Sequence, residues 1–256
     1  PFVNAASTSP ALTERGLKFF FRTTPTDEDF SKLMFSFMKD LSAKSGNKIE
    51  SVSLFHEDTA YGSDSAKVQS RLAKEQSYQL KEDITYKAQT TSLSSEVQRL
   101  KAANADVLLP SSYTSDTFLL LRTSKELDYN PKLIIAQNAG FTDPTFISTM
   151  GKDAEGAITR SPYNGDLAKR IPLITKVNEI FKKHSKGRDL SDVPARVFTG
   201  MMTLVDAINR AGSTDPEKIR AALAATDIAA DQLIVPYTGI KFDAKGQNTG
   251  VRPILM

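Results

Sequence analysis

Apolar and polar residues recur along this chain with two different periods, which predict alternating helices and strands. Phe30, Met34, Phe37 and Leu41 follow each other at spacings of three and four, as on a helix with one buried face, and Gly46 marks its end. Short runs rich in β-branched and aromatic residues predict buried strands between such helices. Strands are predicted over 49–55, 84–86, 106–110, 133–136 and 156–159, and helices over 30–41, 62–76, 114–127 and from a cap at Ser94 or Ser95.

After Pro172 the chain is predicted to be mostly helical. The dipeptide Asp143–Pro144 is expected to open a short helix, with proline at its favoured first position, and Asp215–Pro216 opens another. Apolar faces define two longer helices, one with Leu173, Val177, Ile180 and Phe181, and one with Val197, Met201, Leu204, Val205 and Ile208. The pair Met201–Met202 is therefore expected to pack in a core rather than to serve a cofactor. Residues 239–242 predict a strand, and 243–246 predict a tight turn.

Strand and helix alternate from about Ile49 to Ile158, which is typical of an α/β fold with a parallel sheet covered by helices. In such sheets ligands bind outside the carboxyl ends of the strands. The loops at these ends follow Val3, Phe55, Leu109 and Ile135, and they read NAASTS, HEDTAYG, PSSYTSD and AQNAGFTD. All four are rich in hydroxyl or amide groups, so they predict a polar pocket.

Composition narrows the function classes only a little. A chain of 256 residues with 40% hydrophobic content can form one large domain or two lobes. The 33 basic and 30 acidic residues nearly cancel, so there is no charge bias that favours nucleic acid. Cysteine is absent, which excludes disulfides, thiolate nucleophiles and cysteine metal sites.

The usual signatures of enzymes are missing. There is no G-x-S-x-G elbow, no phosphate loop, no G-x-G-x-x-G turn and no H-E-x-x-H spacing, so no catalytic residue, metal or cofactor is predicted. His56 could be a base or a ligand contact, but a strand-end histidine bonded to the backbone is the favoured interpretation. Glu57 and Asp58 could act as an acid–base pair, although a solvated loop or a helix cap is favoured. Tyr61 and Tyr113 stand in strand-end loops among small residues, where an aromatic ring can close over a ligand.

These loops, taken in order, resemble the type I periplasmic solute-binding proteins, and most of all the branched-chain amino-acid (leucine/isoleucine/valine) receptors of ABC importers. The resemblance covers nearly the whole chain and rests on an ordered set of stretches: Ala6-Ser-Thr-Ser-Pro-Ala-Leu-Thr13, Phe20-Phe-Arg-Thr23, Asp58-Thr-Ala-Tyr-Gly62, Ala105-Asp-Val107 before Ser111-Ser-Tyr113, Gly151-Lys-Asp-Ala-Glu-Gly156 and Phe242-Asp-Ala-Lys-Gly246. It implies two doubly wound α/β lobes with a ligand cleft between them, closed by a hinge. It also implies that the first part of lobe one is missing. The expected division is 1–22 plus 164–236 for a partial lobe one and 23–163 for lobe two, with 237–256 crossing back to form the last strand of lobe two.

The resemblance also implies a set of ligand-binding residues. Ala6, Ser7 and Thr8 match the loop that holds an amino acid's carboxylate and ammonium through backbone groups and a hydroxyl. Tyr61 matches the tyrosine that lobe two folds onto the ligand, and Tyr113 lies where a second such tyrosine is expected.

Two positions depart from the family pattern. Where branched-chain receptors place a glutamate that pairs with the ligand ammonium, this chain has Asn138, whose neutral amide cannot supply that charge. Arg196 lies near an expected hydrophobic ligand contact; it could grip a second carboxylate, although a surface charge is favoured. These departures put leucine in doubt and leave an amide, a carboxylate without an ammonium group or another small polar solute equally open.

The expected function is that of an extracytoplasmic receptor, periplasmic or lipid-anchored outside the cell. It would capture an amino acid or related small carboxylate or amide and deliver it to the membrane permease of an ABC importer. The expectation includes a monomer with no nucleic-acid partner, no cofactor and no metal. Two alternatives remain, a cytoplasmic ligand sensor on the same fold and an enzyme on a doubly wound sheet.

Overall fold

The computed structural model describes residues 1–256, which form two compact units. Unit 1 comprises Pro1–Thr26 and Ser161–Ile254, and unit 2 comprises Asp27–Arg160 and Leu255–Met256. The expected boundaries after residues 22 and 163 lie close to the observed ones, but the tail differs from expectation. Residues from Tyr237 to Phe242 pack in the core of unit 1, where Phe242 meets the ring of Phe21 with centroids 5.1 Å apart, and the expected return to lobe two is confined to the end of the tail, where β10 (Ile254–Leu255) pairs beside β7 in the unit 2 sheet.

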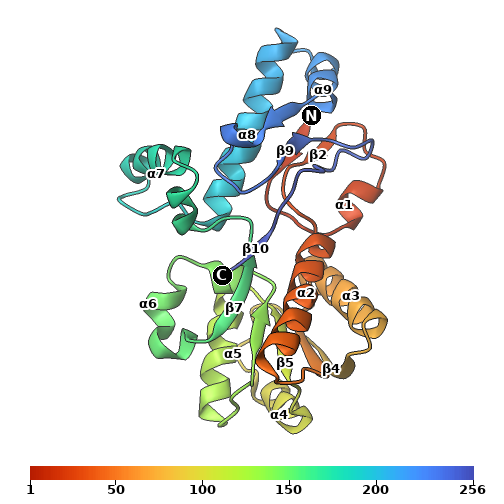
Figure 1. Cartoon of the computed structure of the whole chain (residues 1–256), viewed down its shortest axis with the longest axis vertical. Coiled ribbons are helices and arrows are strands. Elements are labelled where there is room, and N and C mark those ends of the chain that lie inside the picture. The colour runs from red at the N-terminus through yellow and green to blue at the C-terminus, as the bar shows by residue number, and fades with distance from the viewer. The chain divides into compact units, whose positions relative to one another are not determined.

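Unit 2 is built on a six-stranded sheet in the order β10-β7-β6-β5-β3-β4 (Figure 1). The pairs β3–β4, β3–β5, β5–β6 and β6–β7 are all parallel, as the alternating pattern predicts. Its strands are β3 (Ser51–Glu57), β4 (Gln79–Tyr86), β5 (Val107–Ser111), β6 (Ile134–Ala136), β7 (Ala157–Ser161) and β10 (Ile254–Leu255). Its helices are α2 (Asp27–Ser45), α3 (Ala60–Glu75), α4 (Ser94–Ala103), α5 (Thr114–Glu126) and α6 (Phe146–Met150), with short 3₁₀ helices η1 (Ala139–Thr142) and η2 (Gly151–Ala154).

Both faces of this sheet are covered by helices. Successive residues of a strand point to opposite faces, so Leu54 packs with Met34 of α2, whereas Phe55 packs with Leu100 of α4. The two buried clusters flank the sheet as in other doubly wound folds. Because the strands are parallel, the ends of β3, β5, β6 and β7 meet at one edge, and this edge carries the predicted loops after Phe55, Leu109 and Ile135. The fourth predicted loop, after Val3, follows β1 and belongs to unit 1.

Two local predictions in unit 2 are wrong. Ser94 and Ser95 do not cap α4, because they already form its first turn and Leu93 takes the cap position without a side-chain bond. Pro144 does not begin α6, which starts at Phe146, since the carboxylate of Asp143 instead accepts from the amide of Thr145 in the preceding turn.

Unit 1 contains shorter strands and two longer helices. Its parallel pair is β1 (Phe2–Asn4) with β2 (Phe20–Arg22), and its antiparallel pair is β8 (Asp227–Ala229) with β9 (Gly239–Lys241). Its helices are α1 (Ala11–Glu14), α7 (Leu173–His184), α8 (Asp192–Ala211) and α9 (Pro216–Ala224), with η3 (Gly165–Lys169) and η4 (Ala230–Gln232). Asp215 caps α9 as predicted, since its carboxylate accepts from the amide of Lys218.

The buried face of α8 is not the one predicted. Met201 and Met202 are 53% and 50% exposed, so the expected core packing of this pair is wrong. The helix instead buries a row of small and polar residues, namely Ala195, Arg196, Thr199, Gly200, Thr203 and Ala207. Small residues allow close approach of backbones, and a Cβ placed on Gly200 would lie 2.7 Å from the Cβ of Ala5, just after β1.

None of the helices combines the length and the apolar character that a bilayer-crossing segment requires.

Candidate functional site

The predicted site residues are divided between the two units. Ala6, Ser7, Thr8 and Arg196 belong to unit 1, whereas Tyr61, Tyr113 and Asn138 belong to unit 2.

In unit 1 the loop after β1 is organised by a side chain that the sequence analysis missed. The amide oxygen of Asn4 accepts from the backbone nitrogens of Ala6 and Ser7 at 3.1 and 2.9 Å, and its amide nitrogen donates to the carbonyl of Ser7 at 2.9 Å. An asparagine that bonds the backbone two and three residues on is a common turn device, so the N-A-A-S order was the available signal. The two amide N–H groups expected to face an anion are therefore used by Asn4. Ser7 is exposed, Ala6 is half-buried and Thr8 is buried.

Arg196 is not the surface charge that the sequence favoured. It is 5% exposed and forms an ion pair with Asp192, one turn earlier on α8, at 2.5 Å. Its other terminal nitrogen donates to the carbonyl of Ala6 at 2.8 Å. A buried charge needs a partner, and Asp192 supplies it. The structure thus brings Arg196 to the Ala6 loop, with its charge already balanced.

In unit 2 the structure brings the two predicted tyrosines together. Tyr61 stands in the first turn of α3 and Tyr113 just before α5, and their ring centroids are 5.4 Å apart with the planes tilted by 45°. The hydroxyl of Tyr61 donates to the backbone carbonyl of Gln137, while Tyr113 is 43% exposed. Burial raises the pKa of both phenols, so both rings stay neutral at physiological pH. The pair forms an aromatic surface at the carboxyl edge of the sheet.

Asn138 is used by its own loop. Its backbone has a φ of 73°, a left-handed value that asparagine tolerates better than most residues. Its side-chain oxygen accepts from the nitrogen of Ala139 and from the hydroxyl of Thr142, and its nitrogen donates to the carbonyl of Arg160 at 3.0 Å. The hydroxyl of Thr142 also lies 3.2 Å from the carbonyl of Ala139, so its single hydrogen is placed between two acceptors of the same turn. The geometry favours a structural role for Asn138 over pairing with a ligand ammonium.

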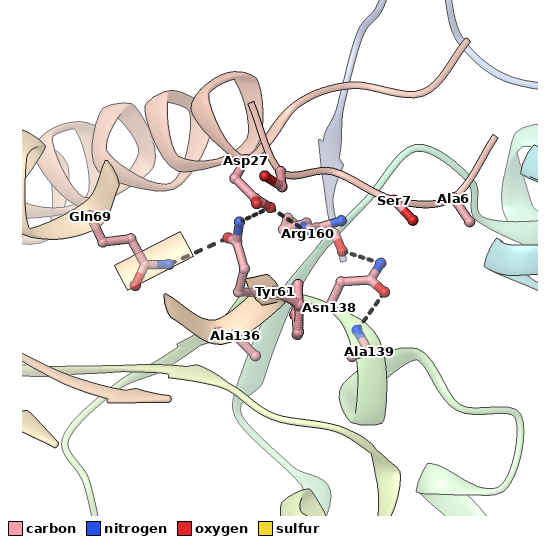
Figure 2. Close-up of polar contacts among 12 residues, drawn as sticks. Ala6, Ser7, Asp27, Tyr61, Gln69, Ala136, Asn138, Ala139 and Arg160 are labelled. Atoms are coloured by element: carbon pink, nitrogen blue, oxygen red, sulfur yellow. Dashed lines mark hydrogen bonds and ion pairs between the residues drawn. The ribbon is translucent and has the colours of Figure 1, made fainter. Parts of the chain in front are cut away.

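A buried polar network lies beside Asn138, and the sequence analysis missed it. Gln137 contacts Gln69 on one side and Asp27 on the other, and Asp27 also faces Arg160; Figure 2 labels Gln69, Asp27 and Arg160. Gln137 donates to Asp27 at 3.0 Å, and Arg160 lies 3.5 Å from the same carboxylate. The guanidinium of Arg160 also stacks at 3.5 Å over the ring of Phe30. Nothing in the sequence marked these two residues, because Asp27 stands among the acidic residues of a helix start and Arg160 lies just beyond the strand predicted over 156–159.

His56 and Glu57 have structural roles, as the favoured interpretations predicted. Glu57 caps α3, because its carboxylate accepts from the nitrogens of Thr59 and Gly62 at 2.5 and 2.6 Å. One ring nitrogen of His56 contacts the backbone carbonyl of Glu57 at 3.2 Å, and the other contacts Asp83 at 3.2 Å.

Comparison with known proteins decides the family. A family model described as periplasmic binding protein matches residues 1–255. The chain belongs to this periplasmic binding protein family. Two related proteins of Brucella abortus are named Leu/Ile/Val-binding protein homologs 7 and 8, and they are 27% and 26% identical over 97% of this chain. This periplasmic binding protein spans 63% and 62% of their respective lengths.

Solved structures show that the periplasmic binding protein has the type I fold of its family. A leucine binding protein from Thermotoga maritima matches all of the chain with a TM-score of 0.83 at 23% identity, over 69% of its own length. A branched-chain amino acid transporter substrate binding protein from Streptococcus pneumoniae, solved with isoleucine, matches with a TM-score of 0.79 at 18% identity, over 68% of its length. A solute binding protein of an ABC transporter from Rhodopseudomonas palustris, solved with 3,4-dihydroxybenzoic acid, matches with a TM-score of 0.80 at 18% identity, over 67% of its length. All three neighbours are named as binding proteins, two of them as binding proteins of transporters, and none is named as an enzyme.

Proposed function

We propose that this protein is an extracytoplasmic solute receptor that delivers a small polar solute to the membrane permease of an ABC importer. The observation that carries the proposal is the tyrosine pair Tyr61–Tyr113 at the carboxyl edge of the unit 2 sheet, in a chain of the periplasmic binding protein family. Ligands of open α/β sheets bind at this edge, and aromatic rings are common in such sites. Binding would be selective capture by closure of two lobes, with no chemical step.

The proposed contacts come from both units. Tyr61 and Tyr113 would cover the solute from lobe two, and the loop with Ala6, Ser7 and Thr8 would meet it from lobe one. Asn138 and Arg196 would support these loops, because their polar atoms are engaged by Thr142, Arg160, Asp192 and Ala6. The proposed receptor acts as a monomer in the periplasm or, lipid-anchored, outside the cell.

The solute class is proposed to be an amino acid or a related small carboxylate or amide. The isoleucine and the 3,4-dihydroxybenzoic acid named for two structural neighbours show that this fold accommodates acids with and without an ammonium group. The side-chain oxygen of Asn138 already accepts from the nitrogen of Ala139 and lies 2.9 Å from the hydroxyl of Thr142, which favours solutes that do not depend on an ammonium contact there.

A thermal-shift screen tests the proposal on the complete gene product. The panel holds isoleucine, leucine, valine, asparagine, glutamine and 3,4-dihydroxybenzoate, with Tyr61→Ala as the control variant. A ligand at ~100 times its dissociation constant stabilises the folded protein by about 2.7 kcal/mol, which gives a clear shift. We expect at least one compound to stabilise the protein and the variant to lose that response. A flat response across the panel would contradict the proposed solute class.

A further inference from the structure

One peptide bond of the chain joins a residue that is hydrogen-bonded within unit 2 to a residue that is hydrogen-bonded within unit 1. Arg160 is in unit 2 and Ser161 is in unit 1, so the chain passes from one unit to the other between them; we call this the crossing peptide. The carbonyl of Arg160 accepts from the side chain of Asn138 at 3.0 Å, within unit 2. The hydroxyl of Ser161 lies 2.7 Å from the carboxylate of Asp192 and 2.6 Å from the carbonyl of Tyr163, within unit 1.

Asp192 extends this contact to the loop after β1. One of its oxygens meets Ser161, and the other pairs with Arg196 at 2.5 Å. Arg196 then donates to the carbonyl of Ala6 at 2.8 Å. Asp192 and Arg196 are 4% and 5% exposed, so their pairing is shielded from water, and loss of either partner leaves a buried charge.

We infer that Asp192 and Arg196 are positioning residues that tie the Ala6 loop to the crossing peptide. The inference rests on the proposed function in one consequence only. A solute at the Ala6 loop would act on one of the three places where the chain passes between the units. In unit 2 the side chain of Asn138 contacts the same peptide, because it donates to the carbonyl of Arg160.

The same contacts argue against Arg196 as a grip for a solute carboxylate. Its positive charge is matched by Asp192, and its two terminal nitrogens are committed to Asp192 and Ala6. A solute carboxylate would have to displace a charge-assisted hydrogen bond in a buried setting, which is costly.

Hydrogen exchange measured by mass spectrometry on the ligand-free protein tests the inference. The amides of Ala6 and Ser7, bonded to Asn4, report on the loop, and the amide of Tyr163, bonded to the hydroxyl of Ser161 at 3.0 Å, reports on the crossing peptide. Arg196→Met should speed exchange about tenfold or more at both places, since a lost charged hydrogen bond has at least that effect on local opening.

A matched control lies on the same helix. Arg210 pairs with Asp206 four residues earlier at 2.8 Å, in the same arrangement as Arg196 and Asp192, but far from both reporters in sequence. Arg210→Met should leave exchange at Ala6, Ser7 and Tyr163 unchanged. Arg196→Lys, which keeps a cation beside Asp192, should restore slow exchange at Tyr163.

The outcomes separate the steps of the inference. Unchanged exchange at Ala6 and Ser7 in Arg196→Met would overturn the positioning role, and faster exchange there without a change at Tyr163 would overturn the link to the crossing peptide. If Arg196→Met does not fold, the near-isosteric Asp192→Asn decides by the same two criteria. The exchange experiment needs no solute. A flat ligand screen would therefore contradict the proposed function alone, and an unchanged exchange pattern would contradict the positioning role alone.

Discussion

The phenol of Tyr61 donates a hydrogen bond to the backbone carbonyl of Gln137, which joins the first turn of α3 to the loop after β6. Burial raises the pKa of this phenol, so it remains a donor throughout the physiological range. The bond fixes the Tyr61 ring in a position where it contacts the Tyr113 ring in a tilted arrangement. Tyr61 therefore combines a structural contact through its hydroxyl with the ring contact that belongs to the proposed site.

Two substitutions at Tyr61 separate these roles. Tyr61→Phe removes the hydroxyl bond and should lower the free energy of unfolding by about 1 kcal/mol while keeping the ring. Tyr61→Ala also removes the contact with Tyr113, so we expect a further loss of about 1 kcal/mol and solute affinity reduced about tenfold or more. Urea denaturation and calorimetric titration with the most stabilising compound of the panel measure both effects. Equal affinity in Tyr61→Ala and the unaltered protein would remove Tyr61 from the site.

The sequence predicts unit 2 well because its periodicities are strong. The α2 helix has its apolar residues on one face, and the strand β5 is a continuous apolar run, so both were visible without tertiary information. Periodicity does not say which neighbour a face will meet. Helix α8 shows this, because Val197, Met201 and Val205 define an apolar row that is 41–53% exposed, while Thr199 and Gly200 pack inside.

The candidate site was predictable only in part. Topology placed Tyr61 and Tyr113 at neighbouring strand ends, and the structure brings their rings together. The burial of Arg196 could not be predicted, because its acceptor on Ala6 lies 190 positions away and charged residues are usually exposed. Asn138 was interpreted by its charge, whereas its left-handed backbone and its bond to Arg160 depend on the fold.

Placing a carboxylate at position 138 tests whether this residue meets a solute ammonium. Asn138→Glu loses the bonds to Thr142 and Arg160 and puts a longer side chain on a residue with φ of 73°, so we expect a loss of at least about 2 kcal/mol in unfolding free energy. Asn138→Asp is the matched control, since it keeps the size and the acceptor oxygen. Calorimetry should show no gain for isoleucine over 3,4-dihydroxybenzoate in either variant. A gain in both would restore Asn138 as the ammonium partner.

Asp106 should make the protein sensitive to acid. Burial alone would raise the pKa of this carboxyl, but hydrogen bonds from the backbone of Glu50 and from Ser51, together with Lys132 at 2.9 Å, outweigh burial and lower the pKa to about 2. A lowered folded-state pKa stabilises the protein above the unfolded-state value of 3.8, and this contribution disappears as the pH falls toward about 2. The loss amounts to about 2 kcal/mol.

Urea denaturation at pH 5, 3 and 2 measures this contribution. Asp106→Asn should start less stable at pH 5 and should lose about 2 kcal/mol less than the unaltered protein between pH 5 and 2. Lys132→Met, which removes one of several partners of Asp106, should show an intermediate dependence. Parallel stability curves for the protein and Asp106→Asn would show that this carboxyl does not titrate with folding.

Gly200 lets α8 approach the loop after β1 closely, at Ala5. A larger residue at position 200 should therefore shift this loop and disturb the proposed site. An alanine methyl there would lie 2.7 Å from the Cβ of Ala5 and 3.4 Å from the hydroxyl of Thr23. Alanine favours the helix by up to about 1 kcal/mol, but overpacking costs about 1–3 kcal/mol, and the Cβ of Ala5 cannot rotate away. We expect Gly200→Ala to lower unfolding free energy by about 1 kcal/mol and to weaken solute binding several-fold.

A compensating change makes this prediction specific. Ala5→Gly removes the methyl that Gly200→Ala would strike, so the double variant should recover solute affinity, and the two changes should be strongly non-additive in a double-mutant cycle. Calorimetric titration of the four proteins gives the coupling directly. If Gly200→Ala binds as the unaltered protein does, the loop after β1 is not part of the solute site. If affinity falls but Ala5→Gly does not restore it, the effect passes through Thr23 instead.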